Sequence, residues 1–395
     1  MTEIQLTAFH LLGLAALGVV LGHAITSRIA FLERVNIPPA IVGGIVFAII
    51  ILILHGQNVG VVFDTTIRDV LMVTFFTTIG MNASLQLLRV GGAQVAIFLG
   101  IAVLGLCAQI AWGVGAAYLF GLNPLVGLIP GAISLTGGPA TALAFGPELE
   151  LRGVVSASAL GVGAGMFGII IGGLLGGLVG GRLIEKQKLA QLVNADVAVV
   201  VVVEEVSDRP PSSWMTTVVL LCLAMGLGTF INAGFKSQGL TLPAYIGPMI
   251  FAAIIRNLDD VWSAGRVTPA RMDEIGAIAL QLFIVMAMLG LKLWEIVNLA
   301  LPVLVILCGQ IAILVLLCWT LVFQLMGRDY HAAVTATGYF GFMMGTTANA
   351  VACMGELVRK YGPSPRAFLV VTIVGAFFID FINALLITTM MNLLD

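Results

Sequence analysis

Charged residues are what this sequence has least of. Only 10% of its 395 residues are Asp, Glu, Lys or Arg, whereas 60% are hydrophobic and the mean hydropathy is +1.11. Soluble domains carry about 25% charged residues, so this composition excludes an ordinary soluble protein. The net charge of −2 offers no basic surface, and we therefore expect no binding to nucleic acid.

Residue types that carry catalytic chemistry are also scarce and scattered. The five cysteines and four histidines stand singly in or beside apolar stretches, without CxxC, HExxH or a Gly-rich phosphate loop. No Ser–His–Asp set and no pair of carboxylates stands inside an apolar run. The sequence therefore predicts that the protein is not an enzyme and uses no organic cofactor.

Long apolar runs make up most of what is present. Backbone polar groups in lipid must find partners within their own segment, so these runs predict helices. Ten of them are long enough to cross a hydrocarbon core of about 30 Å. They lie at 6–25, 37–55, 70–88, 93–119, 153–181, 214–234, 241–258, 275–298, 301–326 and 366–391. We expect an all-α polytopic membrane protein embedded in a lipid bilayer.

Two further segments, 124–147 and 331–356, interrupt this pattern with glycine, proline, hydroxyl and amide residues. The first contains "SLTGGPATALAFG" (134–146) and the second contains "GTTANA" (345–350). Glycine and proline break helices, and irregular backbone persists at membrane depth only where protein or a cavity surrounds it. We predict that each segment is a re-entrant hairpin and that the two tips meet near the bilayer centre.

The basic residues support this topology. If the chain starts outside and each hairpin returns to its own side, 14 of the 18 basic residues lie inside. Only Arg68, Arg152 and Lys236 then lie outside, and Lys292 lies within a span. Such a bias is what the positive-inside rule describes. We therefore predict that both termini are outside the cell and that the linker is cytoplasmic.

An internal repeat divides the chain into halves. "PAIVGGIVFAII" (39–50) matches "PAYIGPMIFAAI" (243–254) at six of twelve positions, 204 residues apart. Gly80 aligns with Gly290, and Thr141 with Thr347, at similar offsets. We predict an N-terminal repeat at 1–181, a linker at 182–213 and a C-terminal repeat at 214–395. Each repeat has five spans, an odd number, so the two are inverted in the membrane, an arrangement typical of secondary transporters.

The hairpin tips are the predicted substrate site. Their half-helix N-termini suit an anion, and their carbonyl and hydroxyl oxygens suit a hard cation. The predicted substrate-binding residues are Ser134, Thr136, Gly137, Gly138, Thr141, Gly345, Thr346, Thr347 and Asn349.

Polar residues inside the spans are the candidates for a Na⁺ site. Asp380 and Asn383, at i and i+3, share a helix face in the last span, and Asn82 stands in the third. A structural hydrogen bond to another helix would equally explain each of the three. The residues also leave open H⁺ as the coupling ion, a different dicarboxylate or amino acid as the substrate, and, more remotely, an ion channel.

Four stretches together resemble the bacterial glutamate:sodium symporter family. They are "FFTTIGMNASLQLL", "GLNPLVGLIPGAISLTGGPATA", "MAMLGLKLWEIVNLALP" and "GPSPRAFLVVTIVGAFFIDFINALL". The resemblance implies Na⁺-coupled uptake of L-glutamate, a small anionic amino acid, across the bacterial inner membrane. It also implies five-helix halves with re-entrant loops, a homodimer and an elevator-like motion. For that motion, we expect the helices of "PAIVGG" and "PAYIGP" to belong to the fixed scaffold.

Overall fold

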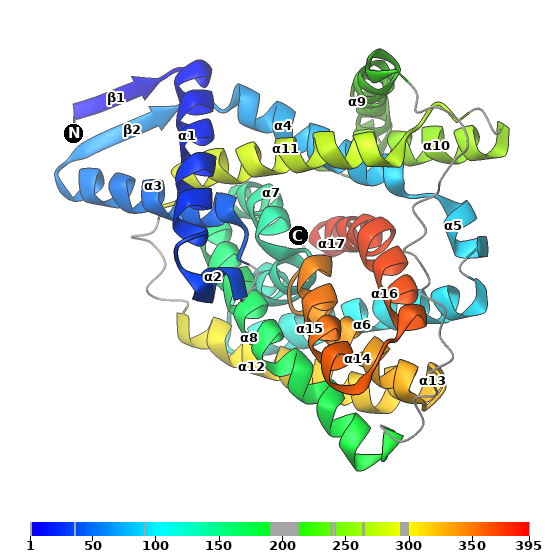
Figure 1. The fold of residues 1–395 in the computed structure, drawn as a ribbon. Coiled ribbons are helices and arrows are strands. Elements are labelled where there is room, and N and C mark those ends of the chain that lie inside the picture. The colour runs from blue at the N-terminus through cyan, green and yellow to red at the C-terminus, as the bar shows by residue number, and fades with distance from the viewer. Residues whose placement is uncertain are drawn as a thin grey trace.

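The computed structural model describes residues 2–34, 37–90, 92–189, 213–237, 240, 242–262, 265–292 and 300–394. Most of the predicted linker therefore lies outside the described residues. The described chain is largely helical (Figure 1). One small sheet, absent from the all-α expectation, pairs β1 (Thr2–Leu6) in parallel with β2 (Val59–Phe63).

Helices occupy all ten predicted spans, but they differ in length. Seven of the described helices are long and apolar enough to cross a membrane. They are α1 (Ala8–Thr26), α3 (Pro39–Gly56), α6 (Gly92–Leu119), α8 (Ala157–Lys186), α9 (Trp214–Ser237), α11 (Pro269–Leu289) and the continuous stretch Leu301–Leu325. That stretch runs through α12 (Ala300–Leu317), η6 (Cys318–Val322) and α13 (Phe323–Leu325).

The remaining three spans are shorter or bent. α16 (Pro365–Phe377) and α17 (Ile379–Leu393) form an eighth span if taken as one helix bent by 43°. α4 (Thr66–Asn82) and α10 (Ile246–Trp262) have 17 residues each, at the short end of the range for a spanning helix. Short helices α2 (Ala30–Arg34) and α5 (Leu85–Val90) follow α1 and α4.

The helices form two layers (Figure 1). α1, α3, α4, α9, α10 and α11 pack on one another as the first layer, and α6, α8, α12, α16, α17 and the two broken segments form the second. The layers touch mainly where α7 (Gly138–Leu151) meets α11 and where α17 meets α4 and α10.

Glycines bring helices of the first layer into backbone contact. A Cβ atom on Gly43 of α3 would stand 1.8 Å from the carbonyl oxygen of Gly18 of α1. A Cβ atom on Gly247 of α10 would stand 2.2 Å from the carbonyl oxygen of Gly228 of α9. Gly43 and Gly247 are equivalent positions of the sequence repeat. The pairs α1–α3 and α9–α10 therefore use glycine in the same way.

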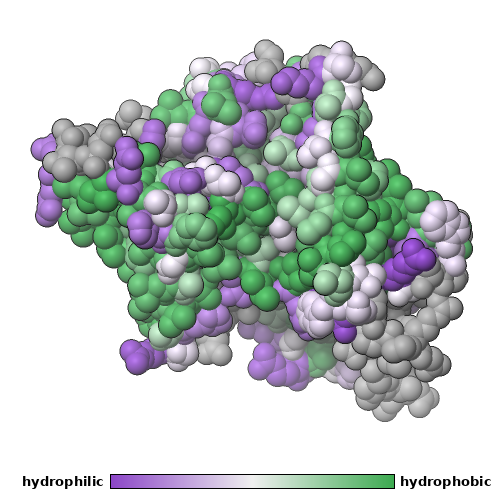
Figure 2. Space-filling model, turned by 90° about the horizontal axis from the view of Figure 1, so that it is seen from above, coloured by the Kyte–Doolittle hydropathy of each residue, from purple (hydrophilic) through white to green (hydrophobic). Residues whose placement is uncertain are grey.

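The outer surface suits a bilayer. In Figure 2, hydrophobic residues form a broad band across the middle of the visible face, and hydrophilic residues gather mostly above and below it. Exposed apolar side chains such as Val20, Leu104 and Phe230 lie on the spanning helices. Lipid tails accept such side chains at no cost, whereas water would not.

Candidate functional site

The first broken segment is irregular along most of its length. It begins with a 3₁₀ turn, η1 (Pro124–Leu128), which Asn123 caps by accepting the N–H of Leu125 at 2.9 Å. A π-helical stretch, η2 (Ile129–Thr136), follows with non-helical backbone at Pro130 and Gly131. The chain then turns at Gly137 and Gly138, and the φ of Gly138, +71°, lies in the left-handed region that favours glycine. α7 starts at this turn.

The second broken segment has two regular arms. α14 (Tyr330–Met343) and α15 (Thr347–Tyr361) are separated by Met344, Gly345 and Thr346. Thr346 caps α15, because its hydroxyl oxygen accepts the N–H of Asn349 at 3.4 Å. Threonine at this position thus explains where α15 begins.

The two breaks lie against each other in space. A Cβ atom on Gly138 would stand 3.6 Å from Thr346 Cγ2 and 3.8 Å from the carbonyl oxygen of Gly345. We call residues 136–141 the first tip and residues 344–349 the second tip. α7 and α15 both begin at these tips. The free N–H groups at the N-terminal ends of the two helices therefore lie close together.

A buried glutamine on α6 bonds the first tip and the residue just before the second tip. The Thr136 hydroxyl donates to Gln109 Oε1 at 2.7 Å, and Gln109 Nε2 donates to the carbonyl oxygen of Met343 at 3.0 Å. Gln310 of α12 donates to the backbone oxygen of Gln109 at 2.9 Å. Both glutamines are fully buried. One amide group therefore bridges the first tip and the end of α14.

The sequence analysis missed these two glutamines, although a signal for them exists. "LCAQIA" (106–111) and "LCGQIA" (307–312) agree at five of six positions, 201 residues apart. A polar residue repeated at equivalent depth in two apolar spans indicates a shared role at the repeat interface.

Oxygen atoms without partners gather around η2. Asn383 Nδ2 donates to the carbonyl oxygen of Ala132 at 2.8 Å. Asn383 Oδ1 and Ser134 Oγ are buried and make no hydrogen bond to the described part of the chain. Asp380, one turn before Asn383 on α17, is half-buried and likewise has no hydrogen bond or ion pair among the described residues. Buried oxygens left unpaired are costly unless a ligand satisfies them.

Two predicted tip residues have structural partners. Asn349 is fully buried and its Nδ2 donates to the carbonyl oxygen of Gly341 at 3.2 Å, which ties α15 to α14. The Thr136 hydroxyl donates its hydrogen bond to Gln109, as described above. Thr141 packs beside Gly137, and Thr347 Oγ1 lies beside Gly375 of α16.

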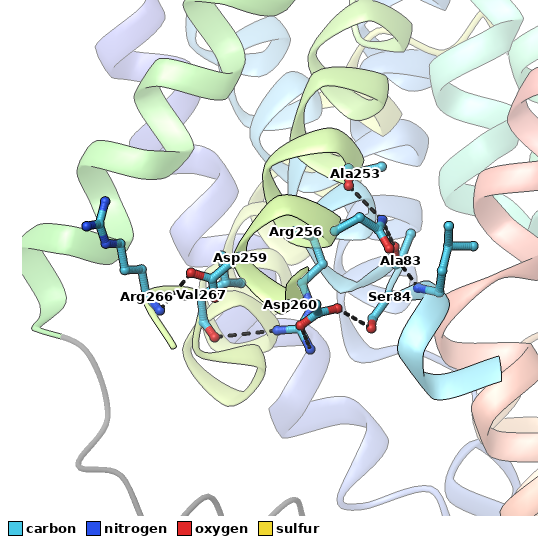
Figure 3. A network of polar contacts seen from close by, with 10 residues as sticks. Ala83, Ser84, Ala253, Arg256, Asp259, Asp260, Arg266 and Val267 are labelled. Atoms are coloured by element: carbon cyan, nitrogen blue, oxygen red, sulfur yellow. Dashed lines mark hydrogen bonds and ion pairs between the residues drawn. The ribbon is translucent and has the colours of Figure 1, made fainter. Parts of the chain in front are cut away.

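Asn82 lies apart from the tips, in the first layer. Its Nδ2 donates to Asp273 Oδ1 of α11 at 2.6 Å, whereas its Oδ1 is buried and makes no hydrogen bond to the described part of the chain. Close by, Asp260 accepts a hydrogen bond from Ser84 and pairs with the buried Arg256 at 3.3 Å (Figure 3). These contacts join the end of α4 to α10 and α11.

Acidic and amide side chains complete this network. Asp259 accepts the backbone N–H groups of Arg266 and Val267, which fixes the turn after α10. Asn257 bonds the backbone at Ala83 and Leu85. The buried Arg256 pairs with Asp260, but Arg256 Nε and Asn82 Oδ1 are buried without a hydrogen bond to the described part of the chain.

A family profile and individual relatives point to the same protein family. The sequence profile of the sodium/glutamate symporter family matches residues 4–363. The sodium/glutamate symporter of Escherichia coli (strain K12) is 36% identical over 379 residues, which cover 94% of each chain. That of Haemophilus influenzae is 32% identical over 393 residues, covering 96% of each chain.

Proposed function

The chain belongs to the sodium/glutamate symporter family, and we propose that it moves glutamate and Na⁺ together by alternating access around the two tips. It is a sodium-coupled glutamate symporter of the bacterial inner membrane, not an enzyme, and Na⁺ is its coupling ion. The proposal concerns where the two ligands bind and how the protein moves. The observation that carries it is the close approach of two helix breaks beside unpaired buried oxygens.

The proposed glutamate site lies at the N-terminal ends of α7 and α15. Each end carries about half a positive charge and free N–H groups, which suit a carboxylate. Gly137, Gly138, Gly345 and Thr346 supply the backbone and hydroxyl groups nearest to this point. Thr141 and Thr347 extend the site along the first turns of the two helices.

The proposed Na⁺ site lies beside η2 and α17. Hard cations prefer oxygen ligands, and Ser134 Oγ, Asn383 Oδ1 and the Asp380 carboxylate are unpaired oxygens in this region of the described chain. Na⁺ bound there would satisfy oxygens that are otherwise buried without partners. Its position next to the first tip would link Na⁺ binding to the substrate site. Asn82 is a separate Na⁺ candidate in the first layer, because its Oδ1 is also buried without a partner among the described residues while its Nδ2 bonds Asp273.

Inverted repeats and an elevator-like motion form the next part of the proposal. Three features support the repeats: the equivalent glycine contacts of α1–α3 and α9–α10, the matched "LCxQIA" motifs and the two paired tips. The layers support the motion, since both tips lie in the second layer while α3 and α10 lie in the first. We propose that the second layer slides against the first, with both tips re-entrant.

The orientation and assembly complete the proposal. The distribution of Lys and Arg supports external termini and a cytoplasmic linker. A homodimer is expected from the family resemblance, and the mass of the detergent-solubilised protein tests it. A monomeric mass at all protein concentrations would contradict that expectation.

Transport in proteoliposomes tests the function. We expect labelled L-glutamate to accumulate when an inward Na⁺ gradient is imposed and not when choline replaces Na⁺ at constant pH. One Na⁺ per glutamate anion moves no net charge and supplies only ~1.4 kcal/mol per tenfold gradient. A second Na⁺ adds the membrane potential, worth ~2.3 kcal/mol per 100 mV. We therefore expect inward positive current, whereas electroneutral uptake would contradict a stoichiometry of two or more.

A further inference from the structure

A basic groove lies between the C-terminal end of α8 and the stretch formed by η6 and α13. It encloses about 640 Å³. Arg182, Lys186 and Arg328 supply its cationic lining, and Trp319, Phe323 and Gln324 line it from η6 and α13. None of these residues takes part in the tips or in the Na⁺ site proposed above.

The three cations are not bonded to any acidic side chain of the described chain. Arg182 and Lys186 are one turn apart on α8, and Arg328 follows the turn at Gly327. Within the residues that the structure describes, none of the three side chains makes a hydrogen bond or an ion pair. Like charges held together cost free energy unless an anion neutralises them.

The one acidic residue of the lining is engaged elsewhere. Glu185 Oε1 accepts from the Tyr361 hydroxyl at 2.9 Å and pairs with Lys360 Nζ at 3.4 Å. Both partners belong to α15, and the single carboxylate of Glu185, which also interacts with the charge of Arg182, stands against three cations. The groove therefore keeps a net positive charge, and its ligand is expected to be anionic.

The groove lies at the depth of lipid headgroups. α8 has 30 residues and is about 45 Å long at 1.5 Å per residue, longer than the hydrocarbon core of about 30 Å. Its last turn, which carries Lys186, therefore reaches the membrane surface. Trp319, 38% exposed, is a residue type that favours this interface.

Exposed apolar side chains lie close in sequence to the lining residues Trp319 and Gln324. Leu316 of α12 is 60% exposed and Leu325 of α13 is 53% exposed, so both are available to an acyl chain. A small soluble anion would use the cations alone, whereas a phospholipid would use the cations and these apolar side chains together. The combination favours the lipid.

We propose that this groove binds the headgroup of an anionic phospholipid. Its phosphate would lie among Arg182, Lys186 and Arg328, and its acyl chain would run along Leu316, Trp319 and Leu325. The chemistry shared with free phosphate is a phosphate anion held by guanidinium and ammonium groups. The apolar wall sets the lipid apart, and the site does not depend on the identity of the transported substrate.

The test measures lipid binding to the purified full-length protein by native mass spectrometry and thermal unfolding. We expect phosphatidylglycerol to bind and to raise the unfolding temperature, and phosphatidylcholine to do neither. Neutralising the groove with R182Q, K186Q and R328Q together should weaken phosphatidylglycerol binding on the order of 100-fold, because each cation near a membrane surface contributes roughly fivefold. A single W319L variant should weaken binding without changing the charge.

A matched variant removes the same charge from other exposed sites. R28Q, R266Q and R359Q together should leave phosphatidylglycerol binding unchanged. Equal weakening by this control would show general charge attraction and overturn the proposal. Stabilisation by inorganic phosphate or glycerol 3-phosphate equal to that by the lipid would overturn the lipid assignment. Lipid binding seen only after E204Q, E205Q and D208N would show that the linker occupies the groove, and would also overturn it.

Discussion

At the scale of single residues, Gln109 joins two distant parts of the chain through one buried side chain. Its side chain accepts from Thr136 in the first tip and donates to Met343 at the end of α14. A long polar side chain buried at membrane depth is expensive unless both ends are satisfied. Here both ends are satisfied, by groups 207 residues apart in sequence. We infer that Gln109 sets the spacing of the tips.

The variant Gln109→Leu tests this spacing. It removes both bonds, leaves the Thr136 hydroxyl with only its weak contact to Met343 Sδ at 3.6 Å, and leaves the Met343 carbonyl without its side-chain partner; a buried polar group that loses its partner costs about 1–3 kcal/mol. We expect a lower unfolding temperature and a KM for glutamate raised on the order of tenfold, equivalent to about 1.4 kcal/mol.

A double-mutant cycle and a control make the Gln109 result specific. Thr136→Val should add little in the Gln109→Leu background, because its partner is already gone. Gln281→Leu, in α11 of the first layer, should leave the KM unchanged. Fully additive effects of Gln109→Leu and Thr136→Val would contradict a shared bond.

Asp380 carries the second prediction at this scale. Asp380→Asn keeps the volume but removes the negative charge that we assign to Na⁺ binding. We expect the Na⁺ concentration for half-maximal uptake to rise on the order of tenfold or more, equivalent to at least about 1.4 kcal/mol. Initial uptake rates at varied Na⁺ measure it.

The control for Asp380→Asn is the same substitution at Asp69, an acidic residue that forms an ion pair. Asp69→Asn changes a half-exposed carboxylate that pairs with Arg68 at 2.7 Å, and it should leave the Na⁺ dependence unchanged. An Asp380→Asn protein with the Na⁺ dependence of the parent would show that Asp380 is not a ligand.

At the scale of elements, the turn at Gly138 decides how α7 meets the second tip. Its φ of +71° alone makes alanine unfavourable, by roughly 1–2 kcal/mol. Alanine would also place a methyl group 3.6 Å from Thr346 Cγ2, in the space between the tips. We expect Gly138→Ala to abolish glutamate-dependent thermal stabilisation in Na⁺.

Gly121→Ala is the control for Gly138→Ala. It imposes a similar backbone strain but adds no methyl group to the proposed substrate site. Gly121 has a φ of +65°, but a Cβ atom there would meet nothing within 4 Å. The two variants should lose similar stability, and only Gly138→Ala should lose the response to glutamate. If both retained that response, the space beside Gly138 would not be the substrate site.

The elements also show what one sequence can predict. The helix breaks at Gly137–Gly138 and Gly345–Thr346 were predictable, because glycine and hydroxyl residues inside an apolar run are a local signal. The pairing of β1 with β2 was not, because helices separate the strands and the pairing is non-local. The bond from Asn82 Nδ2 to Asp273 was not predictable either, because the two residues are 191 apart in sequence and only the fold brings them together.

At the scale of the whole molecule, the two layers differ in what they contain. The first layer holds the buried ion pair of Arg256 with Asp260, whereas close glycine contacts occur in both layers, as at Gly43 in the first and Gly113 in the second. The second holds both tips, Gln109 and the unpaired oxygens. This difference supports the proposal that the second layer carries the ligands and moves against the first, as an elevator-like motion requires.

A cross-link between the layers tests this motion. Val155, in the loop before α8, and Gly290, at the end of α11, both line a cavity of about 460 Å³ between the layers. After replacement of the five native cysteines, Val155→Cys and Gly290→Cys should be joined by a bifunctional thiol reagent. We expect the joined protein to lose glutamate uptake to background while keeping its unfolding temperature.

The control is a cross-link between two helices of the second layer. Glu185 of α8 and Lys360 of α15 are exposed and 3.4 Å apart, so Glu185→Cys with Lys360→Cys can be joined without connecting the layers. Because both helices belong to the layer that we propose to move as one unit, this cross-link should leave uptake intact. Full uptake by the protein joined at Val155 and Gly290 would mean that the layers do not slide, and the alternating-access movement would have to take place within the second layer.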